Sequence, residues 1–373
     1  MIRIQSIILK EIRLPLKEPF VISSGKVENR RILLLKLQDV DGYEAWSECV
    51  AGEFPNYSPE TIDTAWLAIS QWIAPRVLGR VFKGPEEIFL QLQKDFRGHF
   101  MAKAAVEMGV WGLAAHKQGV SLAKLLGGNR KKIPVGISIG LQKSPEILLE
   151  KVKMALAQGY RKIKVKIKPG ADLKYIKFVR ESLGSDAPLM VDANNAYTME
   201  DVQVLKALDE FNLMMIEQPL AWDDLVRHAE LQRQIKTPIC LDESITSVER
   251  AQDMFKLGSG KIINIKPGRV GGFSASIAIH NFCAAHKIPV WCGGMLESGI
   301  GRAYNVALAS LPNFVYPGDI SPSNRYWEKD IVSPEWQMDK AGYIAVPVNK
   351  PGIGVGVDED LVENLTVRQR VLS

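Results

Sequence analysis

Three acidic residues follow one another along the chain at one regular spacing. Asp192 in "VDANN", Glu217 in "IEQP" and Asp242 in "LDES" are 25 residues apart in each case, and an apolar run precedes each of them. Three carboxylates brought together repel one another unless a cation joins them. Oxygen ligands in a small cluster suit Mg2+ best, with Mn2+ or Ca2+ as alternatives. The spacing therefore predicts a divalent metal site.

Two lysine-bearing stretches lie on either side of these acids in the sequence. "KIKVKI" carries Lys164 and Lys166, and "NIKPG" carries Lys266. A lysine beside a metal-held carboxylic acid is suited to removing the proton next to that carboxylate, because the ion stabilises the developing enediolate. We expect the nearby positive charge to lower the pKa of such a lysine, so that a neutral base is available near pH 7.

The elements that must position these groups repeat along the second half of the chain. Short apolar, β-rich runs begin at residues 133, 162, 189, 214, 238, 262, 289 and 314, with helical stretches between them. The spacing of 24 to 29 residues accommodates a strand, a helix and two short loops. Eight such units predict a parallel (β/α)8-type barrel of the α/β class, with an open doubly wound sheet as the alternative.

A barrel gives the lysine strand a defined orientation. Ile163, Val165 and Ile167 would face the helices and the lysines the barrel axis, since strand side chains alternate. We expect Lys162 to reach solvent at the bottom and Lys168 to lie in the exit loop. Lys164 and Lys166 then point to the C-terminal mouth, where barrel enzymes carry their chemistry. Lys266, four strands away, would reach the mouth from the opposite side.

Each of these residues has a structural interpretation when taken singly. An acid at a strand end is usually a helix cap or a solvated loop residue, and Asp242, Glu243 and Ser244 fit a cap, with Glu243 the best candidate. A lysine before a turn is usually a surface residue. Five such groups on consecutive strands at one repeat spacing favour the catalytic interpretation.

The rest of the chain predicts a second domain. Before the barrel, "RRILLLKLQD" and "YEAWSECV" are strand-like and are joined across Asp41-Gly42, a hairpin signal, and helical stretches follow. Strands followed by helices indicate an α+β domain over residues 1–125. We place the barrel at 126–325. The strand- and turn-rich segment 326–373, which includes "GYIAVPVNKPGIGVGV", is expected to return to the first domain.

Composition excludes several classes of protein. The 373 residues are 46% hydrophobic and 24% charged, with no apolar run long enough to span a membrane. "MIRIQSIILKEIRL" lacks a signal-peptide core, so we read it as the first strand of a cytoplasmic protein. The net charge of +5 is dispersed, which disfavours nucleic-acid binding. Without C-x-x-C spacing, the cysteines are expected to be unpaired thiols: Cys49, Cys240, Cys283 and Cys292.

Taken together, these motifs resemble the enolase superfamily, muconate-lactonizing-enzyme subgroup, over nearly the whole chain. The resemblance implies a (β/α)7β TIM-like barrel and an α+β capping domain built from the N-terminal region and the C-terminal segment. By similarity, Asp192, Glu217 and Asp242 bind Mg2+, Lys166 is the acid/base on one face, and Lys266 serves the other. Lys164 would hold the metal-bound carboxylate and tune Lys166.

Within that subgroup, the sequence is similar to the group of o-succinylbenzoate synthases, some of which also racemise N-succinylamino acids. The similarity rests on "IKVKIKPG", "VDANNAY", "CLDESI", "INIKPGRVGG" and "CGGMLESGIGRA". It implies syn dehydration of 2-succinyl-6-hydroxy-2,4-cyclohexadiene-1-carboxylate to o-succinylbenzoate, a step of menaquinone synthesis. Racemisation of an N-succinylamino acid is the rival activity, because it needs the same enediolate. A small-molecule carboxylate is therefore the expected partner, and barrels of this kind often form homo-oligomers.

Several other residues are candidates for substrate binding. Ser138 and Asn194 should point to the mouth, and the amides of Gly293, Gly294 and Met295 could receive the succinyl carboxylate, with a tight glycine turn as the alternative. The first-domain loops "PFVISSGK" (Phe20 and Ile22) and "EFPNYS" (Phe54 and Tyr57) are either lids that exclude water or ordinary surface loops.

Two different kinds of protein remain as alternatives. A Schiff-base aldolase could use Lys166, but that chemistry gains nothing from three carboxylates and a metal. A non-catalytic binding barrel would keep the shape without turnover. The complete set of acids and lysines argues against the second alternative.

Overall fold

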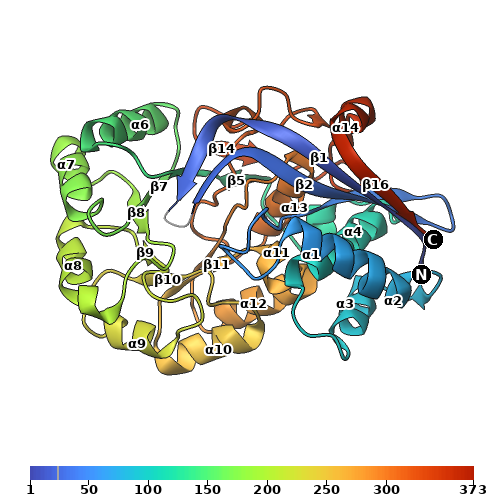
Figure 1. Ribbon diagram of the computed structural model, residues 1–373, viewed down its shortest axis with the longest axis horizontal. Helices are drawn as coiled ribbons and strands as arrows, with labels where there is room; N and C mark the ends of the chain where they lie inside the picture. The colour runs from blue at the N-terminus through green and yellow to red at the C-terminus, as the bar shows by residue number, and fades with distance from the viewer. Residues whose placement is uncertain (23–24) are drawn as a thin grey trace.

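The N-terminal part of the protein is an antiparallel sheet flanked by helices. The structure is a computed structural model that describes residues 1–22 and 25–373 (Figure 1). The main strands run in the order β16-β1-β2-β3, and β4 pairs with β1. The strands are β1 (Ile2–Ile22), β2 (Gly25–Asp39), β3 (Glu44–Cys49), β4 (Val81–Phe82) and β16 (Thr366–Leu372). Figure 1 shows the long β1–β2 pair extending from the end where both termini lie.

The predicted hairpin across Asp41-Gly42 is confirmed. β2 and β3 pair antiparallel, and Gly42 has a φ of 83°, which the tight turn requires and glycine adopts without strain. The helices of this part pack on one face of the sheet, with α4 against β3. They are α1 (Ile62–Ala68), a π-helix (Ile69–Ile73), α2 (Ala74–Val77), α3 (Pro85–Gln93), α4 (Phe100–Lys117) and α5 (Leu122–Leu125).

The second part is the predicted parallel barrel. Seven strands pair side by side in the order β12-β11-β10-β9-β8-β7-β6, and every pairing is parallel. They are β6 (Gly136–Ile139), β7 (Lys162–Lys166), β8 (Leu189–Asp192), β9 (Ile216–Glu217), β10 (Ile239–Leu241), β11 (Ile262–Ile265) and β12 (Val290–Cys292). The open doubly wound sheet is therefore not the fold.

The eighth predicted run forms no regular strand, although it closes the barrel. Val315 N and Asp319 N donate to carbonyl oxygens of β12, at Val290 and Cys292. Gly136 N, on β6, donates to Gly318 O. The run thus contributes isolated bridges between the two edge strands instead of a continuous ladder. The first run also differs from the prediction, because it divides into β6 and the short β5 (Lys132–Pro134).

Helices follow the barrel strands and cover their outer face (Figure 1). Ser144, Ser247 and Ser298 cap three of them with their hydroxyls, which satisfies backbone N–H groups at the helix starts. The helices are α6 (Pro145–Ala157), α7 (Leu173–Leu183), α8 (Val202–Ala207), α9 (Val226–Gln232), α10 (Val248–Leu257), α11 (Pro267–Val270), α12 (Phe273–Ala285) and α13 (Gly299–Ala309), with 3-10 turns at Met199–Asp201 and Leu208–Phe211.

Alternate side chains of the barrel strands point outward to the helices and inward to the barrel axis. Ile163, Val165 and Ile167 lie in the core shared with the outer helices, as predicted. The opposite faces form a dry interior layer of Met190, Met215, Cys240, Ile262 and Trp291. Two residues further along four of these strands the same face carries Asp192, Glu217, Asp242 and Asn264. These polar side chains therefore lie directly above an apolar layer.

The C-terminal segment touches both parts of the molecule. β14 (Tyr343–Ala345) pairs with β5, whereas Gly352 exchanges backbone hydrogen bonds with Val120 and Leu122 beside α4. β16 pairs with β1 and completes the first sheet. The remaining elements are a 3-10 turn (Ser323–Arg325), β13 (Val332–Ser333), β15 (Gly356–Val357) and α14 (Glu359–Leu365).

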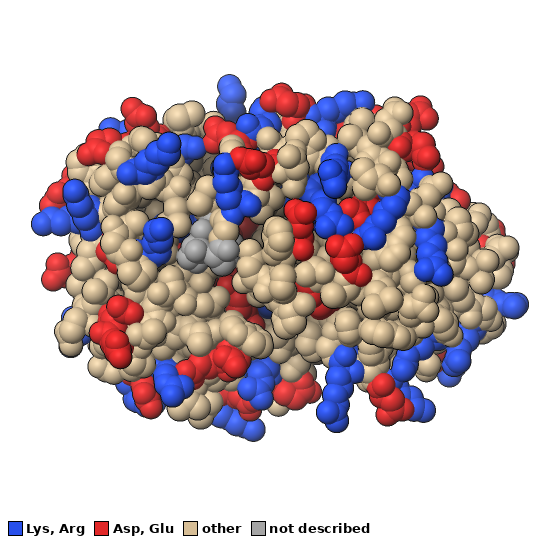
Figure 2. Space-filling view, in the orientation of Figure 1, with Lys and Arg blue, Asp and Glu red and all other residues tan. Residues whose placement is uncertain are grey.

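The distribution of surface charge and the state of the cysteines agree with the predictions made from the composition. On the face shown in Figure 2, basic and acidic side chains are interspersed. The four cysteines are buried and unpaired, as predicted. Within residues 1–22 and 25–373, no helix combines the length and the apolar character needed to cross a membrane.

Candidate active site

The predicted acids and lysines meet at the C-terminal ends of the barrel strands. Asp192 and Glu217 are the last residues of β8 and β9, and Asp242 directly follows β10. Lys166 is level with Asp192, and Asp192 with Glu217, in the pairing of the strands. The three acids are almost completely buried, at 1%, 0% and 0% exposure. One strand-end position, repeated in successive units, thus gathers the carboxylates.

Lys166 and Lys164 bind the acids from one side. Lys166 Nζ lies 2.6 Å from Asp192 Oδ2 and donates to Asn194 Oδ1 at 2.5 Å. Lys164 Nζ lies 3.3 Å from Asp192 Oδ2 and 3.2 Å from Glu217 Oε2. Both ammonium groups are buried, so these carboxylates supply the compensating charge that a buried cation requires.

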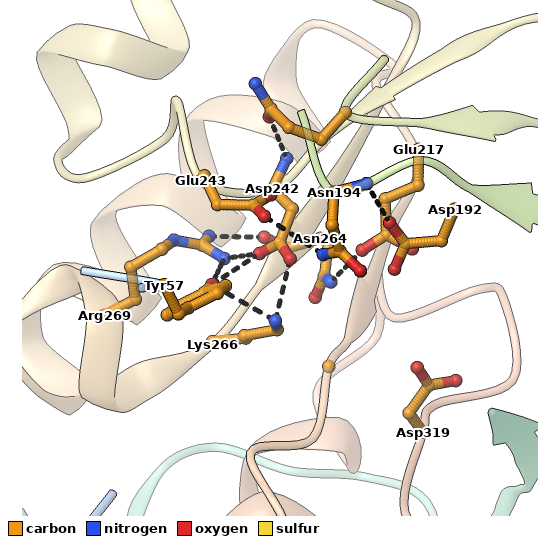
Figure 3. Close-up of polar contacts among 12 residues, drawn as sticks. Tyr57, Asp192, Asn194, Glu217, Asp242, Glu243, Asn264, Lys266, Arg269 and Asp319 are labelled. Carbon is orange, nitrogen blue, oxygen red and sulfur yellow. Dashed lines mark hydrogen bonds and ion pairs between the residues drawn. The ribbon is translucent and has the colours of Figure 1, made fainter. Parts of the chain in front are cut away.

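Lys266 approaches from the other side with two companions. Its Nζ lies 2.7 Å from Asp242 Oδ2 and 3.1 Å from the hydroxyl of Tyr57. Arg269 donates to Asp242 Oδ1, and the Tyr57 hydroxyl donates to the same oxygen at 3.0 Å. Figure 3 shows Tyr57, Lys266 and Arg269 converging on Asp242. β7 and β11 are four strands apart, so the two lysines face each other across the mouth, as predicted.

The charges in this cluster shift one another's titration. Burial raises the pKa of Asp192, but Lys166 and Lys164 outweigh burial and hold the pKa below its usual value. Burial together with Asp192 raises the pKa of Glu217 to about 8. Burial lowers the pKa of Lys266, yet Asp242 and Tyr57 keep it above the usual range. The expectation of a lowered lysine pKa is therefore wrong for Lys266 in this arrangement.

The donor set fits a hard divalent cation by its chemistry. Three buried carboxylates at neighbouring strand ends supply only oxygen ligands. The charge of Asp192 adds to burial in raising the pKa of Glu217, and a cation would relieve that repulsion. Their oxygens here face the amines: in the part of the chain that the structure describes, no three His, Cys, Asp or Glu residues are grouped so as to hold a metal ion. Binding an ion would require these ion pairs to open.

A cavity of about 420 Å³ leads to these groups between the two parts of the molecule. Its barrel side includes Lys166, Asn194 and Lys266, and its other side comes from β2 and the loop after β3. A larger hollow of about 680 Å³ lies between α6 and residues 322–338 and is lined by neither Lys166 nor Lys266. The smaller cavity is the candidate site because Lys266 and Tyr57, whose pKa values are both raised, line it together with Lys166.

The predicted substrate-binding residues are not all at this cavity. Phe20, Phe54, Asn194, Gly294 and Met295 line it, although Phe54 is 68% exposed. Gly293 lies beside Lys266, whose Cε would be 2.7 Å from a Cβ at that position. Ser138 is buried on β6 next to Lys164 in the strand pairing and is not among the lining residues.

One of the two loops predicted to act as lids lies partly outside the described residues. In "PFVISSGK", Ser23, Ser24 and the side chain of Ile22 lie outside the described residues. In "EFPNYS", Tyr57 is bonded to Asp242 as described above, so this loop reaches the reaction centre.

The prediction for Lys162 was wrong. It is fully buried, with Nζ 3.2 Å from Asp319 Oδ1 and 3.2 Å from the centroid of the Trp291 ring. Asp319 lies in the closing segment and was not singled out from the sequence. Its partner lies 157 positions earlier in the chain, so only the fold brings the two charges together. Lys168 is exposed, as expected.

The helix-cap role expected for Glu243 was also wrong. Its Oε1 accepts hydrogen bonds from the side-chain amides of Asn194 and Asn195, at 3.1 and 3.2 Å, and α10 is capped by Ser247 instead. Asn194 and Asn195 have φ values of 42° and 65°. Such left-handed residues directly after a strand are strained and are enriched at functional sites.

Two residues that hydrogen-bond to the acids were difficult to identify from the sequence. Asn264 donates to Glu217 Oε1 at 2.8 Å and shares the inward face of β11 with Lys266. Arg269 stands three residues after Lys266, in the first turn of α11, which brings its guanidinium back to the strand end. The i,i+3 spacing from Lys266 is the signal that could have identified Arg269.

Comparison with protein families identifies both parts of the chain. Residues 4–127 match the N-terminal domain of mandelate racemase / muconate lactonizing enzyme, and residues 148–361 match the enolase C-terminal domain-like family. Together these two matches cover most of the chain.

Individual proteins are similar over nearly the full length. An o-succinylbenzoate synthase from Geobacillus kaustophilus is 49% identical over 98% of this chain and 96% of its own length. An N-succinylamino acid racemase from Thermus thermophilus is 45% identical over 100% and 99%. A crystal structure of an enolase superfamily member from Listeria innocua superimposes with a TM-score of 0.96, at 41% identity and with 100% and 99% coverage.

The fold extends to more distant structures, including a dipeptide epimerase from Cytophaga hutchinsonii determined with Mg and a dipeptide (24% identity, TM-score 0.91, 100% of both chains). Members of the superfamily use a divalent metal. The arrangement of a cap and a seven-stranded parallel barrel with acids on successive strand ends agrees with these matches. The chain therefore belongs to the mandelate racemase / muconate lactonizing enzyme family of the enolase superfamily.

Proposed function

We propose that the protein is an o-succinylbenzoate synthase, a carbon–oxygen lyase that dehydrates 2-succinyl-6-hydroxy-2,4-cyclohexadiene-1-carboxylate in menaquinone synthesis. The observation that carries this proposal is the pair of buried lysines, Lys166 and Lys266, facing each other across three strand-end carboxylates in one cavity. The proposal is supported by relatives that carry this name at 43 to 49% identity.

The metal of the family would be held by Asp192, Glu217 and Asp242. We assign Mg2+, with Mn2+ as the alternative, because the donors are all carboxylate oxygens. When bound, the ion supplies positive charge that stabilises a carboxylate as it becomes an enediolate. The lysine–acid ion pairs would be replaced by ion–acid contacts, which releases Lys166 and Lys266 to face the substrate.

Lys166 would carry out both proton transfers of the dehydration. It removes the α-proton next to the carboxylate and, as the ammonium, then protonates the leaving hydroxyl on the same face, which makes the elimination syn. Lys266, on the other face, would stay protonated and stabilise the enediolate by its charge. Lys164, buried under the acids, would hold the substrate carboxylate.

The substrate's succinyl group would extend toward the cavity wall made by Gly294 and Met295. Asn194 and Gly293 border the reaction centre, and Phe20 and Phe54 would cover the ligand from the first domain. We keep Ser138 as a proposed contact through its unbonded hydroxyl next to Lys164, although it is off the cavity lining.

Racemisation of N-succinylamino acids is the second candidate activity. Two opposed lysines allow the α-proton to be removed from one face and returned to the other. Relatives named N-succinylamino acid racemase are 45% identical to this chain, the same identity as the o-succinylbenzoate synthase from Bacillus subtilis. Both activities use the same enediolate, and one site can support both.

Steady-state assays on both substrates test the proposal. We expect Mg2+-dependent formation of o-succinylbenzoate that stops in EDTA and returns when Mg2+ is added. Racemisation without dehydration would make the racemase the main activity. An absence of turnover on both substrates would favour a non-catalytic binding barrel.

We also propose that the domain boundaries lie at residues 125 and 325, that the protein forms a homo-oligomer and that it is cytoplasmic.

A further inference from the structure

The carboxyl group of a first-domain residue, Glu48, lies at the start of a barrel helix, and burial raises its pKa to about 8. Glu48, near the end of β3, accepts hydrogen bonds at Oε2 from Ser298 N (3.1 Å), Ser298 Oγ (2.6 Å) and Gly301 N (3.1 Å). The residue is 1% exposed. A Cβ on Gly301 would lie 2.8 Å from the same oxygen, so glycine there permits the close approach. Glu48 therefore satisfies backbone donors of α13 that the barrel leaves open.

The loop just before α13 is a wall of the candidate site. Gly294, Met295 and Leu296 are half-buried and line the cavity, whereas residues 297–309 are all buried. The loop is tightly confined, because a Cβ on Gly294 would lie 2.5 Å from Asp319 O. Whatever holds the end of this loop also shapes the cavity.

The same loop is in a strained conformation. Leu296 has a φ of 57°, in the left-handed region that side chains other than glycine rarely adopt. Such a conformation persists only when the surrounding structure holds it in place. The wall would relax to another shape if its anchors were lost.

Three sets of contacts anchor the chain directly after Leu296. Within the barrel, Asn305 donates to Glu297 Oε1 at 2.8 Å and Arg302 donates to Glu297 O at 3.0 Å. The second anchor is Glu48, which comes from the first domain and binds the next residue, Ser298. The third comes from the C-terminal segment, where Asp330 Oδ1 accepts from Gly299 N at 2.8 Å. The strained wall is thus held jointly by the barrel and by the cap.

We propose that Glu48 is a positioning residue that fixes the wall Gly294–Leu296 and so determines affinity for the part of the substrate lying beyond the two lysines. The inference rests on the proposed function, since it assumes a succinyl-bearing carboxylate in this cavity. Glu48 contacts neither lysine nor any of the three acids, so its loss should weaken substrate binding more than chemistry.

A half-buried acid with the same kinds of hydrogen-bond donors provides a control at the opposite end of the barrel. Asp209 also accepts from two backbone amides and one hydroxyl: Lys236 N (2.9 Å), Thr237 N (2.8 Å) and Thr237 Oγ1 (2.7 Å). It lies in the 3-10 turn before β9 and is not among the residues that line the cavity. Asp209→Asn therefore tests what loss of such a carboxylate does to stability alone.

Steady-state kinetics of Glu48→Gln test the inference, with whichever of the two proposed substrates the wild-type protein turns over. We expect KM to rise about tenfold with kcat within about twofold, the pattern for lost uniform binding. Asp209→Asn should leave both constants unchanged. Unchanged KM in Glu48→Gln, or an equal rise in Asp209→Asn, would overturn the inference. If the wild-type protein turns over neither substrate, it is the proposed function that fails.

A double-mutant cycle tests whether Glu48 affects KM through Ser298. Because Glu48 acts through Ser298, Ser298→Ala should raise KM, and the double variant should do no worse than Glu48→Gln alone. Additive effects would contradict this route.

Amide exchange in peptides covering residues 293–298 should accelerate in Glu48→Gln but not in Asp209→Asn, a readout that needs no substrate. Equal exchange in all three proteins would refute the positioning role.

Discussion

Asp319 Oδ2 lies 2.5 Å from Lys164 Nζ, and the other oxygen of the same carboxylate lies 3.2 Å from Lys162. One acid in the segment that closes the barrel therefore pairs with two lysines of β7. Burial raises the pKa of Asp319, but the two lysines outweigh burial and hold the pKa at about 2. The acid is ionised at neutral pH and supports Lys164 from beneath the reaction centre.

The first prediction concerns the stability of this buried group. Asp319→Asn leaves Lys162 without a carboxylate partner in a dry interior, so unfolding should become easier by roughly 3–5 kcal/mol. Lys162→Met removes the buried cation itself and fits beside Trp291, so it should be close to neutral or stabilising. Urea unfolding of both variants measures the difference. An equal loss of stability in the two would contradict the ion-pair account.

The second prediction concerns the general base. Lys166→Ala should lower kcat by about 10²–10⁴-fold, because the variant has no group within reach of the α-proton on that face. Lys168→Ala, on the exposed loop after the same strand, is the control and should retain full activity. Initial rates of o-succinylbenzoate formation provide the measurement, and a Lys166→Ala enzyme of nearly normal rate would refute the assignment.

The third prediction concerns the metal. Asp192→Asn should weaken Mg2+ binding by at least about tenfold, since even residues that only orient ligands commonly contribute that much. Asp209→Asn, which removes a carboxylate outside the site, should bind Mg2+ as the wild type does. Titration calorimetry with Mg2+ alone separates these outcomes without reference to activity. Equal affinity in all three proteins would place the ion elsewhere.

The fourth prediction uses a buried lysine far from the metal site. Lys103 on α4 donates to Phe96 O and Gln93 Oε1, and burial lowers its pKa to about 8 despite the nearby Glu60. An unfolded lysine titrates near 10.4, so between these values the unfolded chain binds more protons. The contribution of Lys103 to stability should therefore rise with pH in this window and disappear as pH falls through about 8.

Comparing wild type with Lys103→Met isolates that contribution. The difference in free energy of unfolding should shift in favour of the wild type between about pH 8 and pH 10. A difference that does not change with pH would show that Lys103 keeps an ordinary pKa.

The sequence predicted the barrel and the main charges because their signals are local and periodic. Alternation along residues 162–167 separates lysines from aliphatic residues, and the 25-residue unit brings Asp192, Glu217 and Asp242 to equivalent strand ends. Neither signal requires knowledge of distant contacts. The hairpin at Asp41-Gly42 was predictable for the same reason.

The residues that were missed depend on contacts between distant parts of the chain. Lys162 could be placed correctly only with Asp319 and Trp291, and Glu243 only with the asparagines after β8. Tyr57 was recognised as part of a loop, but its bond to Asp242 joins residues 185 positions apart. The eighth run forms isolated bridges to the two edge strands instead of a regular ladder, a difference that periodicity does not reveal.

The central claim is that one enediolate forms between Lys166 and Lys266, and α-deuterium exchange tests it most directly. Each enantiomer of an N-succinylamino acid is incubated in D2O with the wild type, Lys166→Ala or Lys266→Ala, and incorporation is followed by NMR. We predict that each variant exchanges only one enantiomer, and that the two variants exchange opposite ones. Exchange of both enantiomers at wild-type rates by either variant would contradict the account.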